Sequence, residues 1–211
     1  SKSDAMGTSH VLRGFTDALS KAEKNITLIS PYFVPGKQGK AALIHAESRG
    51  RSVSVLTNSL AANDVAAVHG GYSKYRKDLA KGGVQLFELK PTAGADADTS
   101  WFGSSAASLH TKAALIDDRN VFVGSFNLDS RSVSLNCEQG ILAEHPHLAK
   151  EMRAMFNAVT DKRFAWEVAV DEGNNLIWAD DSGVSEREPK AGVSRKIQAF
   201  LSRILPFEAQ L

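Results

Sequence analysis

The 211-residue chain carries 25 Lys and Arg against 24 Asp and Glu, a formal net charge of +1, and 43% of its residues are apolar. This composition suits one folded domain and excludes intrinsic disorder, while the balanced charge argues against a general nucleic-acid binder. A single cysteine excludes a disulfide scaffold, and no apolar run reaches the ~20 residues that span a bilayer.

Helical and strand patterns alternate through the first ninety residues. Apolar spacing predicts helices over residues 11–19, 41–48 and 65–80, and β-branched or aromatic runs predict strands over residues 26–34, 52–57 and 84–89. Strands joined through helices pair in parallel by right-handed crossovers, with helices on both faces of the sheet. The predicted fold class is therefore α/β, with a mixed, largely parallel sheet between helical layers.

The second half of the chain opens with residues 90–105, which lack periodicity and are expected to form a long loop. Strands are then predicted over residues 109–116, 121–124, 137–143, 166–170 and 176–178, and helices over residues 146–162 and 193–205. We expect residues 1–8 to be a tag or linker, residues 9–180 to form the catalytic domain, and residues 181–211 to form a linker and an amphipathic helix.

Four polar residues are predicted to meet across a strand pair. His110 and Lys112 lie two apart on one strand and so share a face. If the chain reverses between Asp118 and Arg119, Lys112 lies opposite Ser125 and His110 lies opposite Asn127. Because Asp-Arg is not a strong hairpin turn, a slipped register is the alternative.

The predicted cluster suits a phosphate group. Lys112 supplies a compact positive charge, and Ser125 and Asn127 supply neutral donors for phosphate oxygens. His110 has the chemistry of a nucleophile toward phosphorus or of a general acid for an alcohol leaving group. Metal ligation fits poorly because lysine is cationic and no Cys or His cluster with ligand spacing surrounds it. We therefore expect phosphoryl transfer that needs no metal and no other cofactor.

The motif His110-x-Lys112-x-x-x-x-Asp117, followed by Gly124-Ser125-x-Asn127, resembles the HKD motif of the phospholipase D superfamily. The segments at residues 30–36, 56–60, 68–72 and 205–208 resemble the second half of bacterial cardiolipin synthases, above all their C-type branch.

This resemblance implies a phospholipase D-like domain and a phosphatidyltransferase that forms cardiolipin through a phosphohistidine intermediate. The acceptor would be phosphatidylglycerol, and in the C-type branch the expected donor is phosphatidylethanolamine. It also implies peripheral contact with the cytoplasmic face of the bacterial inner membrane, and no nucleic-acid partner is expected.

The chain carries one such motif, because none of its other five histidines is followed by Lys two residues later. The family's mechanism needs two motifs. The second would come from an N-terminal half of the same chain or from a homodimer partner, and the isolated chain is expected to be inactive. By resemblance, His110 would then be the general acid and base. The alternatives are a phospholipase D-type phosphodiesterase or nuclease that acts as a homodimer, and a non-catalytic scaffold.

Several residues carry two interpretations. Asp117 falls at the predicted turn, which favours structural support over direct chemistry. In relatives the position of Glu138 orients the histidine of the opposite half-site, but a solvated strand residue is the alternative. Arg131 and Asn136 could contact a phosphate or hydrogen-bond their own loop. The basic, amphipathic pattern of residues 193–205 is compatible with a membrane interface and with packing on the domain core.

Overall fold

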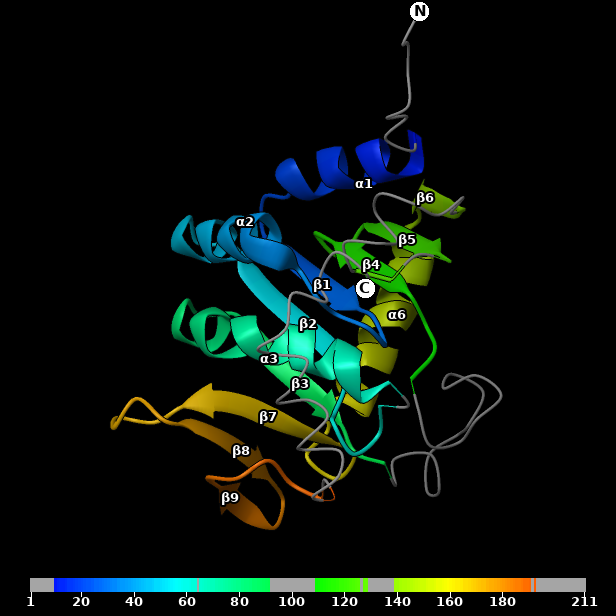
Figure 1. The fold of residues 1–211 in the computed structure, drawn as a ribbon. Helices are drawn as coiled ribbons and strands as arrows, with labels where there is room; N and C mark the ends of the chain where they lie inside the picture. Colours follow the sequence, from blue (N-terminus) through cyan, green and yellow to red (C-terminus); the bar gives the residue numbers. More distant parts are fainter. Residues whose placement is uncertain are drawn as a thin grey trace, which may run out of the picture.

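The computed structural model describes residues 10–63, 65–91, 109–125, 127–128, 139–190 and 192. Its helices are α1 His10–Ser20, α2 Gly36–Ser48, α3 Ala66–Lys81 and α6 Pro146–Val159. Its strands are β1 Asn25–Ile29, β2 Ser52–Asn58, β3 Gln85–Leu89, β4 Ala113–Ile116, β5 Asn120–Gly124, β6 Gly140–Glu144, β7 Ala165–Val170, β8 Leu176–Asp180 and β9 Gly183–Ser185. These strands form one sheet in the order β6-β5-β4-β1-β2-β3-β7-β8-β9 (Figure 1).

Only the centre of the sheet is parallel. β1 pairs with β2 and β2 with β3 in parallel, through the crossover helices α2 and α3. Every other pair of neighbouring strands in this sheet is antiparallel. The α/β class and the mixed sheet are confirmed, and the parallel part is confined to three strands. The tight turns after β4, β7 and β8 are too short for a crossover and permit only antiparallel neighbours.

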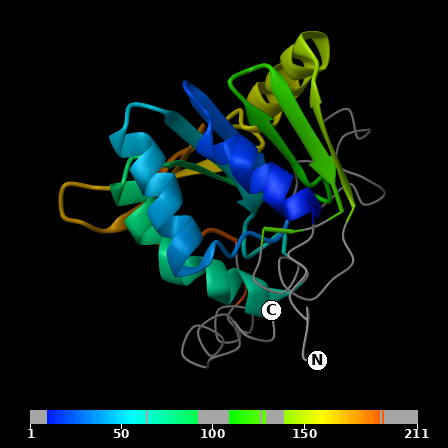
Figure 2. The same cartoon turned by 90° about the horizontal axis from the view of Figure 1, so that it is seen from above.

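Two hydrophobic layers enclose the sheet. On one face, α1, α2 and α3 contribute Phe15, Leu43 and Tyr72 to a core that includes Val55 and Ala114. On the other face, α6 packs the side chains of Met152 and Phe156 against strand residues such as Leu56 and Leu115. Figure 2 shows α6 on the opposite side of the sheet from α1, α2 and α3. Consecutive residues of β4 enter different cores, which explains why this strand is apolar without alternation.

Several boundaries differ from the predictions, and one strand was not predicted. α2 begins at Gly36 rather than at residue 41. β1 ends at Ile29 rather than at residue 34, because the chain turns out of the ladder at Ser30 and Phe33 pairs with Leu128 instead. β4 begins at Ala113 rather than at residue 109. β9 was not predicted; it continues the sheet beyond the expected domain boundary at residue 180. The predicted helix at 193–205 and the predicted loop after residue 91 lie outside the described residues.

Candidate functional site

The predicted site lies at the carboxyl ends of the central parallel strands. β4 runs antiparallel to β1 and pairs Ala113 with Ile29, so the residues that precede β4 lie beyond the end of β1. His110 and Lys112 belong to this segment. Ligands of open α/β sheets commonly bind at the carboxyl ends of the parallel strands.

The register between β4 and β5 differs by one residue from the prediction. Ala113 pairs with Val123 and Ile116 with Asn120, and the Gly124 N–H donates to the Lys112 carbonyl at 3.0 Å. Lys112 therefore lies opposite Gly124, not Ser125, and the predicted pairing of His110 with Asn127 is wrong as well. The cause is a three-residue turn in which Asp117 and Asp118 adopt left-handed conformations, with φ of 55° and 52°. Asp tolerates this conformation better than most residues.

Because of this slip, the strand ladder alone does not place the four polar residues on one face. If both strands were extended, His110 and Lys112 would share a face of the sheet with Ala114 and Ile116. Ser125 and Asn127 would share the opposite face with Val121. The ladder between the two strands stops at Gly124 and Ser125 lies in a bend, so the alternation of faces does not extend to these two residues. The path of the chain after β5 determines where they lie.

His110 is exposed and Lys112 is half-buried, both in extended chain before β4. The Lys112 ammonium donates to the His110 carbonyl at 2.8 Å. This contact holds a positive charge beside the histidine backbone, where a phosphate group would be attracted to it. Gly124, which lies opposite Lys112, has no room for a side chain: a Cβ there would meet the ring of Phe122 on the same strand at 2.7 Å and the Gln139 carbonyl oxygen, just before β6, at 2.9 Å.

Ser125 and Asn127 follow β5. The Ser125 hydroxyl accepts from the Gln139 N–H at 3.0 Å and lies 3.3 Å from the Gln139 carbonyl, which ties it to the start of β6. Asn127 is half-buried, and its Oδ1 atom is buried with no hydrogen-bond partner among the described residues. A buried amide oxygen without a partner is a group that a bound ligand could satisfy.

Asp117 lies at the other end of β4 from His110, seven residues away along an extended chain. Its carboxylate accepts from the backbone N–H groups of Glu23, Lys24 and Asn25 at 2.7–3.1 Å. Partial burial alone would raise the pKa of Asp117, but the three N–H donors lower it. This placement supports the interpretation that Asp117 is a structural residue, because its carboxylate joins the β4–β5 turn to the loop before β1.

Two buried polar residues bond the segments that carry the site. The sequence analysis included them in the family-like segments at residues 30–36 and 56–60 but gave them no role. The Asn58 side chain, at the end of β2, accepts from the Leu109 N–H at 2.9 Å and donates to the Leu109 carbonyl at 3.2 Å. The Ser30 hydroxyl, just after β1, accepts from the Leu128 N–H at 3.2 Å. A polar residue that ends a run of apolar strand residues is the sequence signal that could have identified both. Glu138, Arg131 and Asn136 lie outside the described residues.

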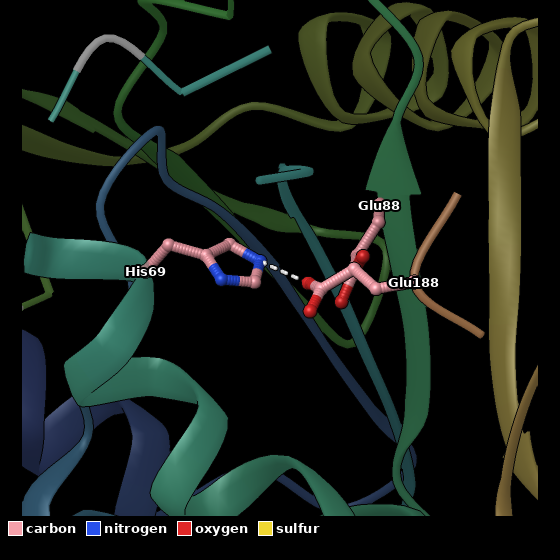
Figure 3. Close-up of side chains that lie close together, drawn as sticks. All are labelled: His69, Glu88 and Glu188. Carbon is pink, nitrogen blue, oxygen red and sulfur yellow. Dashed lines mark ion pairs between the residues drawn. The ribbon is translucent and has the colours of Figure 1, made fainter. Parts of the chain in front are cut away.

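One cluster has the donor types of a metal site. Ligand atoms of His69, Glu88 and Glu188 lie within 4.8 Å of one another (Figure 3). However, the Arg76 Nη1 atom lies 2.8 Å from Glu88 Oε1 and 3.0 Å from Glu188 Oε1, so a guanidinium already bonds both carboxylates and offsets one of their two negative charges. Burial lowers the pKa of His69, which keeps its imidazole neutral beside Arg76. The arrangement is a buried ion-pair network that attaches residue 188 to α3 and β3, and a dication there would be repelled by Arg76.

No helix in the described part of the chain combines the length and apolarity that crossing a bilayer requires.

The family profile described as the phospholipase D-like domain of cardiolipin synthase matches residues 15–160. The chain is 39% identical over 206 residues to cardiolipin synthase C of Escherichia coli, covering 91% of this chain and 42% of that protein. It is 31% identical over 160 residues to cardiolipin synthase A of Pseudomonas syringae, covering 76% of this chain and 29% of that protein. The chain thus spans less than half the length of these relatives.

Two solved structures share the fold. A phosphatidylserine synthase of Haemophilus influenzae superposes with a TM-score of 0.61 at 16% identity, covering 95% of this chain and 46% of that one. Nuc, a phospholipase D family member of Salmonella typhimurium, superposes with a TM-score of 0.54 at 18% identity, covering 70% of this chain and 85% of that one. The chain belongs to the phospholipase D-like domain family of the cardiolipin synthases.

Proposed function

We propose that this chain supplies one catalytic half-site of a phosphatidyltransferase that forms cardiolipin. The observation that carries the proposal is the placement of the HKD-like segments. The residues before β4, with His110 and Lys112, and those after β5, with Ser125 and Asn127, are both held at the carboxyl ends of β1 and β2. The similarity to cardiolipin synthase C over most of the chain supports a phospholipid as the substrate.

The proposed reaction has two displacements at one phosphorus atom. A histidine attacks the donor phosphodiester, so that a P–N bond forms and the P–O bond to the departing alcohol breaks. A second histidine gives its proton to that alcohol. It then takes the proton of the incoming glycerol hydroxyl of phosphatidylglycerol, whose oxygen displaces the first histidine. We assign the acid and base role to His110 and phosphate binding to Lys112, Ser125 and Asn127.

Two histidines are needed, and this chain contributes one motif. The other half-site would come from the N-terminal part of a longer chain or from a second copy. The shorter span of this chain relative to its relatives supports the first source. We therefore expect the isolated chain to turn over little or no substrate. Glu138 is proposed to orient the histidine of the opposite half-site.

The substrates also imply where the protein works. Phosphatidylglycerol and the phosphatidyl donor, for which we propose phosphatidylethanolamine, are bilayer lipids, so the site must reach a membrane surface. We propose peripheral contact with the cytoplasmic face of the bacterial inner membrane, with residues 193–205 as the segment to test first. Retention of the protein by phosphatidylglycerol vesicles, and its loss on deletion of these residues, would support this.

The test uses the full-length enzyme that contains this chain. It is incubated with phosphatidylglycerol, with and without phosphatidylethanolamine, in the presence of EDTA, and the products are identified by mass spectrometry. We expect cardiolipin from the unmodified enzyme and none from His110→Ala. His147→Ala is the matched control, because His147 lies exposed on α6, and it should retain full activity.

Other products would overturn the proposal in distinguishable ways. Phosphatidic acid in place of cardiolipin would identify a hydrolase that uses water as the acceptor. Cleavage of DNA without action on lipid would identify a nuclease. Undiminished cardiolipin synthesis by His110→Ala would remove His110 from the mechanism.

A further inference from the structure

Two of the buried polar side chains lie at the carboxyl ends of the central strands β1 and β2, and each bonds a segment of the candidate site. Ser30 follows β1 and is 0% exposed, and Asn58 ends β2 and is 1% exposed. The strands stay in register up to this point, because Ile29 pairs with Leu56 and the Ser30 N–H donates to the Leu56 carbonyl at 3.0 Å. Buried polar groups are stable only when they are hydrogen-bonded, so the partners of these two side chains indicate what they do.

Asn58 replaces a missing strand partner. β1 pairs with β4 only as far as Ala113, because the chain leaves the ladder at Ser30. The Asn58 amide bonds both the N–H and the carbonyl of Leu109, as a neighbouring strand would. Leu109 is 4% exposed and directly precedes His110. The Asn58 side chain therefore fixes the backbone from which the histidine projects.

Ser30 plays the equivalent part for the segment after β5. Its hydroxyl donates to the Tyr32 carbonyl at 2.7 Å and accepts from the Leu128 N–H, while the Val34 N–H donates to the Leu128 carbonyl at 2.7 Å. Leu128 is thus held on both sides, and it directly follows Asn127. The two contacts lie on neighbouring parallel strands, which are rigidly paired.

We propose that Asn58 and Ser30 are positioning residues of the phosphate site. Asn58 places His110, Ser30 places Asn127, and the β1–β2 ladder fixes the distance between the two. The inference rests on the proposed function and identifies which residues build the geometry that the reaction needs. A displacement of about 1 Å in a reacting group can lower the rate by about 100-fold, so loss of either contact should act on turnover.

Asn58→Leu and Asn58→Asp provide the main test in the full-length enzyme. Leucine is similar in size and removes both bonds. Aspartate keeps an acceptor for the Leu109 N–H but places a second oxygen against the Leu109 carbonyl, so only one of the two bonds is lost. Asn58→Asp is the variant to measure if Asn58→Leu does not fold. Ser54→Ala is the matched control: it removes a buried hydroxyl that bonds Gln85 Oε1 at 2.7 Å at the other end of β2. Ser30→Ala tests the second contact.

We expect kcat to fall about 10- to 100-fold in both Asn58 variants and in Ser30→Ala, with KM for phosphatidylglycerol changed less than threefold. Ser54→Ala should keep its kcat even if it melts at a lower temperature. Hydrogen exchange followed by mass spectrometry should show faster exchange at Leu109 in Asn58→Leu, which removes the acceptor of its N–H, and at Leu128 in Ser30→Ala.

His110→Ala in the same assay separates this inference from the proposed function. If His110→Ala is inactive while folded Asn58 and Ser30 variants keep kcat within twofold of the unmodified enzyme, the positioning role is wrong. A fall in kcat that merely follows the melting temperature, and that Ser54→Ala shares, would also overturn it. If His110→Ala stays active, the proposed function fails first.

Discussion

Replacement of Asp117 distinguishes a catalytic aspartate from an anchoring one. The carboxylate accepts from three consecutive backbone N–H groups, and Asp117→Ala removes all of these bonds. Glu23 and Lys24 are exposed, so water can replace part of what is lost. We therefore assign about 0.5–1 kcal/mol to each of the three N–H groups, below the usual value for a charged acceptor. The free energy of unfolding should fall by about 2 kcal/mol, equivalent to about 4–8 °C in melting temperature.

Urea unfolding at pH 7 measures the change, with Glu172→Gln in the exposed β7–β8 turn as the control for loss of a surface carboxylate. Asp117→Asn keeps one acceptor oxygen but loses the charge and the second acceptor, so its stability should fall between that of Asp117→Ala and that of the unmodified protein. Without denaturant, the kcat of the folded Asp117→Ala enzyme should stay within about threefold of that of the unmodified enzyme. A kcat loss of 100-fold or more at unchanged stability would refute the anchoring role.

The pH dependence supplies an independent check on Asp117. Its folded-state pKa is lowered, so the unfolded chain binds the proton more readily. The stabilisation is therefore complete above the unfolded pKa near 3.9 and is lost as the pH falls through the lower folded value. The stability difference between unmodified protein and Asp117→Ala should be constant from about pH 5 upward and shrink below about pH 4. A difference that grew toward acid pH would contradict the structure.

Two further substitutions test the buried ion pair and the end of β5. Arg76→Leu leaves the 0%-exposed Glu88 without its cation and should lower the free energy of unfolding in urea by about 3–5 kcal/mol. The double variant Arg76→Leu/Glu88→Leu should recover most of that loss, and a double variant no more stable than Arg76→Leu would contradict this. Gly124→Ala places a Cβ against the Phe122 ring and the Gln139 carbonyl oxygen, so it should destabilise the protein by about 1–3 kcal/mol and lower kcat; a neutral result in both assays would show that the β5–β6 contact is looser than described.

Much of the fold could be read from local patterns. The helical spacing around Phe15 and the β-branched residues of β2 depend on neighbours within a few residues. In the part of the chain that the structure describes, each predicted element overlaps an observed one. The residue types of the candidate site also follow from the sequence, because imidazole, ammonium, hydroxyl and amide groups at that spacing suit a phosphate group. Polarity and periodicity are local properties, and no tertiary contact is needed to recognise them.

Other features depend on contacts between residues far apart in the chain. The register of β4 on β5 is set by two left-handed residues, Asp117 and Asp118, and Asp117 is held by N–H groups more than ninety residues earlier in the chain. The extension of the sheet through β9 depends on pairing with β8, and the burial of Glu188 depends on Arg76 of α3.

The sequence by itself therefore determined the α/β class, the order of the elements up to β8 and the residue types of the candidate site. Only the tertiary structure decided how those residues are placed. Lys112 lies opposite Gly124 rather than Ser125, and the side chains of Asn58 and Ser30 bond the backbone of the two site segments. The physical reason is that the alternation of residues in a strand does not say which residue pairs with which. A one-residue slip changes every pairing partner but leaves the sequence pattern unchanged, and here hydrogen bonds to distant residues select the register.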